Sequence, residues 1–443
     1  MGGQPVSATP STTPSVSFQS VHGLGVACAL AAGVWLGAAE APTKLVNSGL
    51  SPYAISLCMV AGVFTARWTV PTLLKGTRYV FADLAHCKHL VLNAILAGML
   101  WAVANTLTVF AIRDVGLTIA FPLWNTNSLV GILWGRLLFG ELKGASTKNV
   151  IKVVAGALAI VVAAILLGFS TIQAGGQHPA RALSGILAAA GASLLWGTMY
   201  IPYRKAYISG MNPLSFVTVF TIGELGTCFA LVLALDGGTK AAIFHSPEVK
   251  HLIFWLFLGG FVWVIGDLFQ QFATKYLGIG RAIPLSNTNQ LWGLAWGALV
   301  FGELAHADWS HRLLVVAGSL VMILGALAVS TAVATARENQ SINEALLREC
   351  CRYGLDYDRI VQSYGGATHG DRLASSDSRS LDGRSWWDYA IVAAAVGVFV
   401  YLGVNAKIPT LGMNFTWLAV LVVILVGAAL WSGWGLWKTT RFS

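Results

Sequence analysis

The sequence WAVANTLTVFAIRDVGLTIAFPLWNTNSLVGILWGRLLFGEL, from Trp101 to Leu142, is written a second time from Trp263 to Leu304, as WVIGDLFQQFATKYLGIGRAIPLSNTNQLWGLAWGALVFGEL. The two stretches align without a gap, and both end in Phe-Gly-Glu-Leu. A further alignment, one position out of step with the first, places Trp35, Lys44, Gly49 and Pro52 on Trp196, Lys205, Gly210 and Pro213. The chain therefore contains two copies of one unit, covering most of residues 21 to 334.

The composition is that of an integral membrane protein. Of 443 residues, 56% are hydrophobic and 11% are charged, against about 25% charged in an average soluble domain. The net charge of +9 comes mostly from Lys and Arg in alternate short connections, so no nucleic-acid partner is predicted. The six cysteines form no framework, and we expect no disulfide, metal site or cofactor.

Apolar stretches of the length that crosses a bilayer, about 20 residues, recur along the chain. Ten belong to the repeats, near 21–41, 53–74, 90–112, 117–139, 149–169, 182–202, 213–236, 252–274, 279–301 and 311–334. Two more, near 387–404 and 416–437, have no copy. The predicted fold is an all-α integral membrane protein: a ten-helix inverted five-plus-five repeat bundle plus two extra C-terminal transmembrane helices.

The domain organisation follows from these spans. We predict a disordered tail at 1–20, a first repeat at 21–170, a second at 181–334, a polar cytoplasmic insert at 335–386 and the extra helix pair at 387–443. Ser341 and Glu344 form a capping box that predicts a short helix of about three turns in the insert. The insert is either a tether to the last two helices or a regulatory or partner-binding segment.

The orientation of the repeats points to transport. Lys and Arg gather in alternate connections, which places both termini in the cytoplasm of a multi-pass cell membrane protein. Because each repeat has five spans, the second copy starts on the opposite side of the membrane from the first. Inverted repeats of this kind form a midplane site that is exposed to each side in turn.

Polar and aromatic residues recur on the repeated helices. Trp101 and Asn105 share a face of the third span, and their copies on the eighth are Trp263 and Asp267. On a regular fourth or ninth span, Asn125 and Asn287 would point away from Asn127 and Asn289. However, Pro122 and Pro284 interrupt both helices, which marks a binding site at the midplane. Alternatively, Asn and Thr only repair the interruption and hold helices together.

The candidate substrate-binding side chains are uncharged. Indole plates and amides suit a neutral polyol, because amides both donate to and accept from hydroxyl groups. We therefore expect a small-molecule substrate, a monosaccharide, at Trp101, Asn105, Trp124, Asn125, Asn127, Trp263, Gln270, Asn287 and Asn289. Aromatic residues in membrane helices also serve as packing or interfacial anchors.

Three intramembrane acids are candidates for proton coupling: Asp267 first, with Glu224 and Glu40 as alternatives. Asp267 replaces the neutral Asn105 of the other repeat, and thus adds a group that can gain and lose a proton. It could instead form a buried ion pair, with Arg67 as the nearest partner by depth, or contact the substrate. Glu141 and Glu303, at the span ends, are expected to reach water and to be structural.

The pattern from Gly98-Met-Leu-Trp101 through Asn105, Gly116, Pro122 and the Phe-Gly-Glu-Leu ending resembles the glucose/ribose porter (GRP) family. That family is related to the rhamnose-proton symporters and to EamA-type carriers of the drug/metabolite transporter superfamily. The resemblance covers about residues 21 to 334. It implies a ten-helix inverted-repeat carrier, with both ends cytoplasmic, that takes up a sugar with protons.

Two other functions stay open from the sequence. The chain could be an exporter or exchanger of another small metabolite, such as an amino acid, nucleoside or ureide. It could also be a non-transporting sensor or scaffold that signals through residues 335–386. An enzyme is not expected, because the sequence has no His-Glu-Xaa-Xaa-His, Gly-Xaa-Ser-Xaa-Gly or phosphate-loop motif. A homo-oligomer is compatible with all these readings.

Overall fold

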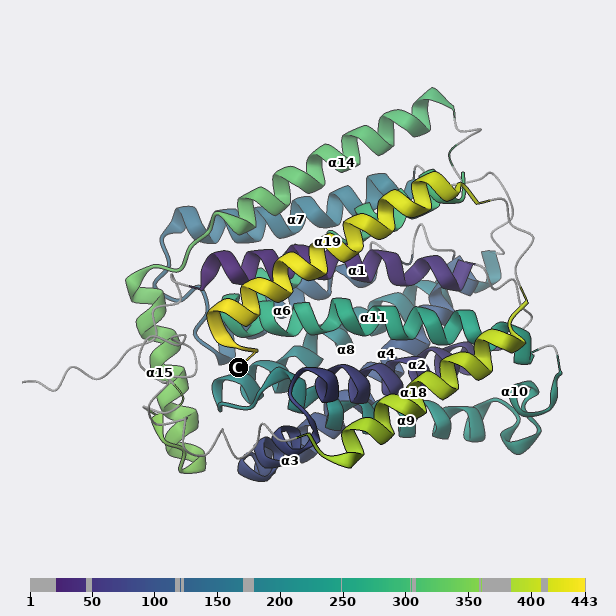
Figure 1. Cartoon of the computed structure of the whole chain (residues 1–443). Coiled ribbons are helices and arrows are strands. Elements are labelled where there is room, and N and C mark those ends of the chain that lie inside the picture. The colour runs from purple at the N-terminus through teal and green to yellow at the C-terminus, as the bar shows by residue number, and fades with distance from the viewer. Residues whose placement is uncertain are drawn as a thin grey trace, which may run out of the picture.

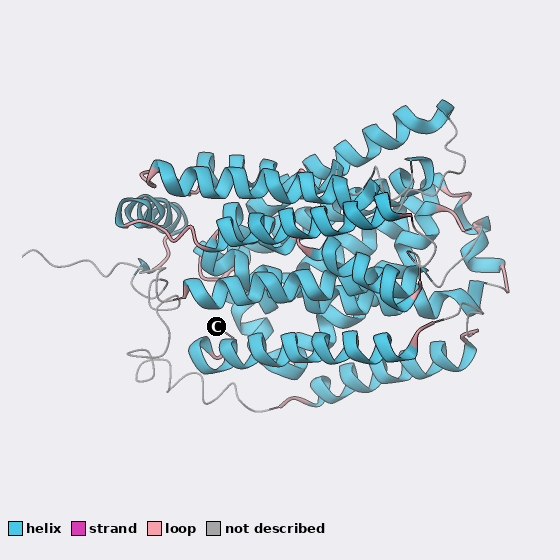
Figure 2. Ribbon diagram, turned by 90° about the horizontal axis from the view of Figure 1, so that it is seen from above, coloured by secondary structure: helices cyan, strands magenta, loops and turns pink. Residues whose placement is uncertain are grey.

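The structure is a computed structural model, and it describes residues 21–44, 50–115, 120, 123–169, 179–247, 249–302, 304, 308–357, 360, 384–407 and 413–442. All regular secondary structure in these residues is helical (Figures 1 and 2). The predicted N-terminal tail, residues 1–20, lies outside the described residues. The all-α class predicted from the sequence is confirmed.

Ten helices in the described part of the chain are long and apolar enough to cross a membrane. Eight belong to the repeats and two follow them. They are α1 (His22–Lys44), α2 (Pro52–Leu74), α4 (Lys88–Val115), α7 (Thr147–Phe169), α8 (Pro179–Ile208), α9 (Pro213–Leu235), α11 (Val249–Leu277), α14 (Trp309–Ser330), α18 (Trp386–Asn405) and α19 (Phe415–Thr440). The chain is a multi-pass membrane protein.

The fourth and ninth predicted spans are the ones that are not continuous helices. The fourth contains α6 (Asn127–Leu138), and the ninth is divided into α12 (Ile279–Ser286), α13 (Asn289–Ala295) and the π-helical turn η2 (Trp296–Val300). The ninth breaks at Asn287–Thr288, three residues beyond Pro284, which stays inside α12. Thr288 repairs this break, since its hydroxyl donates to the Leu285 carbonyl at 2.8 Å.

The two repeats are inverted, because helices that are copies of each other run antiparallel. Ser51, just before α2, donates its hydroxyl to Asp236, just after the copy helix α9, at 2.5 Å. Lys152, near the start of α7, likewise donates to the hydroxyl of Thr331, just after the copy helix α14, at 3.1 Å. The start of one helix thus meets the end of its copy in both cases.

The same close helix contact occurs once in each half of the core. Gly62 on α2 packs against Gly260 on α11, and the copies of these residues, Gly223 on α9 and Gly98 on α4, pack in the same way. A Cβ atom on any of the four would come within about 2 Å of a backbone carbonyl oxygen of the opposite helix, as close as 1.9 Å at Gly260. Small residues therefore bring the four central helices α2, α4, α9 and α11 into backbone contact.

The extra helices lie on the outside of the bundle (Figure 1). α18 follows α2, where Arg384 donates to the Leu73 carbonyl at 2.7 Å, and α19 lies along α1, where Trp35 donates to the Leu425 carbonyl at 3.0 Å. Most of their residues are not buried in the protein. Short helices join the spans: α3 (Thr77–His86), η1 (Gly238–Lys240) and α10 (Ala242–His245).

The predicted helix of the insert is longer than the sequence indicated. It is α15 (Ala336–Tyr353), and its N-cap is Thr335, whose hydroxyl accepts the Glu338 amide at 3.3 Å. Ser341 therefore lies inside the helix, and the predicted capping box at this residue was wrong. Gly354, with a φ of +63°, ends the helix as expected. α15 lies across one end of the bundle, which we call the α15 end (Figures 1 and 2).

Candidate functional site

Three charged side chains meet in the centre of the four core helices. Arg67 of α2 donates to Glu224 of α9 and to Asp267 of α11, in both cases at 2.6 Å. The side chains of Arg67 and Glu224 are fully buried, and that of Asp267 is 1% exposed. The ion pair that the sequence analysis held open for Asp267 and Arg67 is therefore formed. Glu224 joins the same cluster, which we call the charged triad.

The two carboxylates of the charged triad are not equally satisfied. Asp267 uses both oxygens, because the amide of Gln271 donates to its Oδ1 at 2.9 Å and Tyr207 in turn donates to Gln271. Glu224 Oε1 accepts no hydrogen bond from the described residues. With one cation and two acids ionised, the triad carries a formal charge of −1 in a site closed to solvent. The structure thus provides a buried carboxylate oxygen that is open to a proton.

Aromatic rings enclose the guanidinium group. Arg67 lies over the Phe220 ring at 4.5 Å and the Trp263 ring at 5.4 Å from their centroids. Trp263 makes an edge-to-face contact with its own repeat copy, Trp101, at 5.0 Å. Since two copies touch, this contact lies where the two repeats meet. The predicted aromatic plates are therefore brought together, directly beside the charged triad.

A second polar cluster joins the interrupted helices of the two repeats, and we call it the amide cluster. Asn287 donates its side-chain amide to Asn127 at 3.0 Å and to the Asn125 carbonyl at 3.2 Å. Asn125 donates to Gln290 at 3.3 Å, and Gln290 donates to the Ala164 carbonyl at 2.9 Å. On regular helices Asn125 and Asn287 would point away from Asn127 and Asn289, but turns interrupt the helices at Thr126 and at Asn287–Thr288, and Asn287 reaches Asn127.

Other predicted site residues take different positions. Asn289 adjoins the amide cluster in the chain, and its side-chain oxygen Oδ1 is buried and accepts no hydrogen bond from the described residues. Gln270 donates to Ser286 at 2.6 Å and Asn105 to Ser56 at 2.8 Å, so both are tied to neighbouring helices. Trp124 packs edge-to-face on Trp196 of α8 at 6.1 Å, away from the indole pair. Trp124 thus contacts α8, whereas Trp101 and Trp263 contact each other.

The acids at the span ends and on α1 differ in what the structure describes. α1 includes Glu40, but its side chain lies outside the described residues, as does Glu303. Glu141 was expected to reach water, and this was wrong: it is 1% exposed. It accepts the backbone amides of Ile279 and Gly280 at 3.0 and 2.8 Å. Its carboxylate thus caps the N-terminus of α12, which agrees with a structural role.

Several residues of the site were missed from the sequence. Gln290 follows the repeated Asn-Thr-Asn directly, but its repeat copy is Ser128 and no pattern pointed to it. Gln271, Tyr207 and Phe220 support the charged triad without a motif of their own. A usable signal was the presence of three ionisable residues, Arg67, Glu224 and Asp267, on apolar spans, because such residues usually pair with one another.

The comparison with protein families agrees with this architecture. The family model described as sugar transport protein matches residues 50–170 and 187–355, which is more than half of the chain. The chain belongs to the sugar transport protein family. The matched region includes the charged triad, the indole pair, the amide cluster and α15. It ends before the extra helices α18 and α19.

Proteins named as putative sugar uptake proteins are among the similar sequences. A Streptococcus pyogenes serotype M1 protein named "Putative sugar uptake protein" is 43% identical over 80 residues, 18% of this chain and 26% of the relative. An Enterococcus faecalis protein of that name is 28% identical over 129 residues, 29% and 40% of the two chains. One from Listeria innocua is 22% identical over 258 residues, 57% of this chain and 83% of the relative. The matched segment thus spans about a quarter of the streptococcal protein.

Proposed function

We propose that this protein is a secondary transporter that moves a monosaccharide together with a proton, by alternating access between its two inverted repeats. The observation that carries the proposal is the charged triad. It lies fully buried at the centre of the helices where the repeats pack together, in a chain of the sugar transport protein family. We further propose that the membrane is the cell membrane and that the α15 end faces the cytoplasm.

The formal charge of the triad supports coupling to a proton. A buried site with one guanidinium and two carboxylates has one negative charge too many, and an uncompensated charge is costly where water is excluded. Uptake of one proton makes the site neutral. Glu224 Oε1, which accepts no hydrogen bond from the described residues although the Thr221 hydroxyl lies near this carboxylate, is the position where that proton fits with the least rearrangement. The other ionisable groups that face it are Arg67, Asp267, Tyr203 and Cys228.

The neighbouring side chains support a neutral, hydroxyl-rich solute. The amide cluster offers both donors and acceptors without a net charge, and the Trp101–Trp263 pair offers flat apolar surfaces. Arg67 does not favour an anionic substrate, because two carboxylates already neutralise it. A sugar ring has both kinds of surface, since its C–H faces are apolar and its rim carries hydroxyl groups.

The contacts between the two amide copies support alternating access. Asn287 donates to Asn127, so exact symmetry would have Asn125 donate to Asn289. Asn125 donates to Gln290 instead, and the side-chain oxygen of Asn289 accepts no hydrogen bond from the described residues. We propose that the two repeats exchange these arrangements when the site turns to the other side of the membrane. The missing contact between Asn125 and Asn289 then forms, and the one between Asn287 and Asn127 breaks.

The proposal is tested with Glu224→Gln and Asp267→Asn in reconstituted vesicles. Each variant leaves Arg67 paired with one carboxylate but makes the triad neutral, so the proton is no longer needed. We expect exchange of labelled for unlabelled sugar to persist in both, while accumulation driven by a pH gradient is lost. Asp236→Asn, the same change at an acid outside the triad, should keep both activities. Accumulation against a gradient by both triad variants would rule out the proposed coupling.

A further inference from the structure

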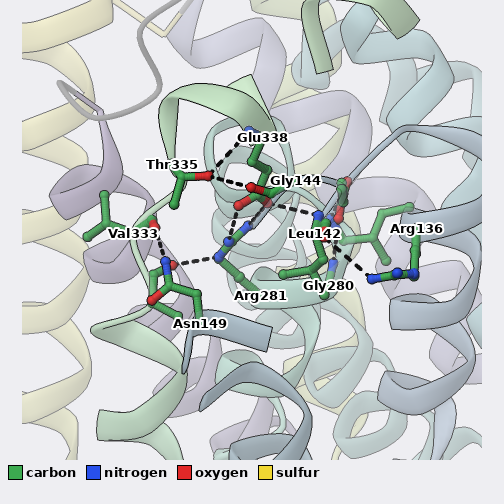
Figure 3. A network of polar contacts seen from close by, with 12 residues as sticks. Arg136, Leu142, Gly144, Asn149, Gly280, Arg281, Val333, Thr335 and Glu338 are labelled. Carbon is green, nitrogen blue, oxygen red and sulfur yellow. Dashed lines mark hydrogen bonds and ion pairs between the residues drawn. The ribbon is translucent and has the colours of Figure 1, made fainter. Parts of the chain in front are cut away.

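Glu338 of α15 ties the two repeats together at the α15 end (Figure 3). Its carboxylate is fully buried and accepts two hydrogen bonds from the guanidinium of Arg281 on α12, at 2.8 and 2.9 Å. It also accepts the backbone amide of Leu142, in the corner between α6 and α7, at 2.9 Å. Arg281 belongs to the second repeat and Leu142 to the first. One side chain of the insert therefore holds both halves of the protein.

A second carboxylate connects the same parts of the two repeats. We call this junction, between the corner at Leu142 and α12, the joint. Glu141, next to Leu142, accepts the amides of Ile279 and Gly280 and forms an ion pair with Arg204 of α8 at 3.2 Å. The corner of the first repeat is thus attached to α12 directly through Glu141 and indirectly through Glu338. Any movement that separates this corner from α12 has to break both sets of contacts.

α15 also packs tightly on the corner itself. Gly140, with a φ of +70°, lies so close to the helix that an added Cβ would be 2.9 Å from the Ser341 carbonyl oxygen. Gly144 leaves 3.0 Å between such an atom and the Cβ of Arg337, and its carbonyl accepts the Thr335 hydroxyl at 3.2 Å. No space for a solute is left between α15 and this corner.

The space beneath α15 is almost filled. A cavity of about 10 Å³ remains there, lined by His22, Arg204, Tyr276, Leu277, Arg281, Ala334 and Ile342. This volume corresponds to about one water molecule. The α15 end of the joint is therefore closed to a sugar in this conformation, and α15 covers the closed joint.

We propose that α15 is a strap that locks the joint between the repeats, and that this end opens only after Glu338 has separated from Arg281. The residues after the repeats then set the rate of the conformational change, although they contribute nothing to the substrate site. The strap acts on the transport cycle proposed above, but its contacts do not depend on which solute is carried. This role differs from both a passive tether and a partner-binding segment.

The first test changes the charge of the strap in the full-length protein. Glu338→Gln removes the ion pair with Arg281 and keeps the side-chain shape, so we expect sugar exchange to become several-fold faster than in the wild type. Glu344→Gln is the matched control, because it makes the same change on the exposed side of α15. An unchanged or slower exchange in folded Glu338→Gln protein would contradict the proposal.

The second test fixes the strap in place. The position of a Cβ on residue 140 is 3.4 Å from the Cβ of Ser341, close to the separation found in disulfides. Oxidation of the double variant Gly140→Cys/Ser341→Cys should stop exchange, and a reductant should restore it, whereas each single variant should not respond. The reference is the same double variant in its reduced form, because both forms carry the strain of a side chain at residue 140, where φ is +70°. If the cross-link forms quantitatively by mass spectrometry and exchange continues at the rate of the reduced form, α15 does not move during transport.

A third measurement needs no substrate. Deuterium uptake at the Leu142, Ile279 and Gly280 amides reports opening of the joint directly, because all three donate to Glu338 or Glu141. We expect faster uptake in Glu338→Gln and slower uptake in the cross-linked protein. Equal uptake in all three proteins would overturn the strap even if no transported sugar had been found, so its failure is separate from failure of the proposed function.

Discussion

The charged triad has an uncharged counterpart at the positions related to it by the internal symmetry. The repeat alignment carries Arg67 onto Cys228, Asp267 onto Asn105 and Glu224 onto Val63. In the structure, Asn105 donates to Ser56 at 2.8 Å, and Ser56 lies 3.4 Å from the Cys228 sulfur. The contact of α2 with α11 thus contains the ion pair of Arg67 and Asp267. The copy of this contact, α9 with α4, has Cys228 and Asn105 at the corresponding positions.

This difference separates residues that the packing of two inverted repeats requires from residues that it does not require. The glycine contacts of the core are identical in both halves, and packing two inverted repeats requires them. Each charged residue of the triad has an uncharged copy in the other repeat, so packing does not require the charges. A feature that breaks the symmetry of a duplicated protein without serving its packing is a candidate for function. The charged triad fits that description, whereas the paired glycines do not.

Removing the cation of the charged triad should give the largest difference in stability between this site and its uncharged copy. Arg67→Met leaves two buried carboxylates without a cation, and breaking a buried ion pair in this way costs about 3–5 kcal/mol. We expect a large drop in the thermal unfolding midpoint of the purified protein in detergent. The control is Cys228→Ala at the symmetry-related position, which should cost much less. Equal losses in the two variants would show that the two sites are equivalent after all.

Substitutions at the paired glycines test the symmetric part of the comparison, the packing of the core helices. Gly260→Ala and Gly98→Ala each place a Cβ within about 2 Å of a carbonyl oxygen on the opposite helix. Overpacking of this kind typically costs about 1–3 kcal/mol. Because the contacts are copies, we expect similar decreases in thermal stability for both variants. Gly427→Ala on α19, where nothing lies within 4 Å of the added atom, is the control. A strong effect at one copy and none at the other would contradict the symmetric core.

The amide copies should show a smaller and unequal effect. Asn127→Ala and Asn289→Ala should each weaken sugar binding, by about 1–3 kcal/mol for a lost hydrogen bond to a ligand. Without sugar the two should differ, since Asn127 accepts from Asn287 and the Asn289 oxygen has no partner. We therefore expect thermal stability to fall in Asn127→Ala and to stay nearly constant in Asn289→Ala. Normal sugar affinity in both variants would favour the alternative in which these residues only repair the helix break.

Much of the fold could be predicted from the sequence, because a duplication restricts the possible arrangements strongly. The gapless alignment of Trp101–Leu142 with Trp263–Leu304 and an odd number of spans per repeat are enough to predict inverted copies. The antiparallel contacts between α2 and α9 and between α7 and α14 confirm this prediction. The domain boundaries and the cytoplasmic placement of the termini stay predictions.

The site was less predictable, since its members come from separate helices. The sequence could propose Arg67 as a partner of Asp267 by depth, but helical periodicity alone does not give the side of α2 that faces α9. Glu224 was therefore not placed in the same cluster. The orientations of Asn125 and Asn287 could not be predicted for a related reason: they depend on local backbone geometry at Thr126 and Thr288, where a threonine hydroxyl donates to the carbonyl three residues earlier.

The insert shows the same limit. Thr335-Ala-Arg-Glu338 and Ser341-Ile-Asn-Glu344 both match the capping-box pattern, so the local sequence does not distinguish between them. The choice is made by tertiary contacts, because starting α15 at Thr335 brings Glu338 onto Arg281. Contacts across the chain thus decide where α15 begins.

Proton-coupled sugar transport can be measured directly as uptake of labelled monosaccharides into vesicles that contain the purified wild-type protein. We expect at least one sugar to accumulate above its external concentration when a proton gradient is imposed inward. We also expect the external medium to become more alkaline as this sugar enters. Collapsing the gradient should return the sugar to equilibrium. Uptake that never exceeds equilibrium, or accumulation driven by sodium and not by protons, would contradict the account.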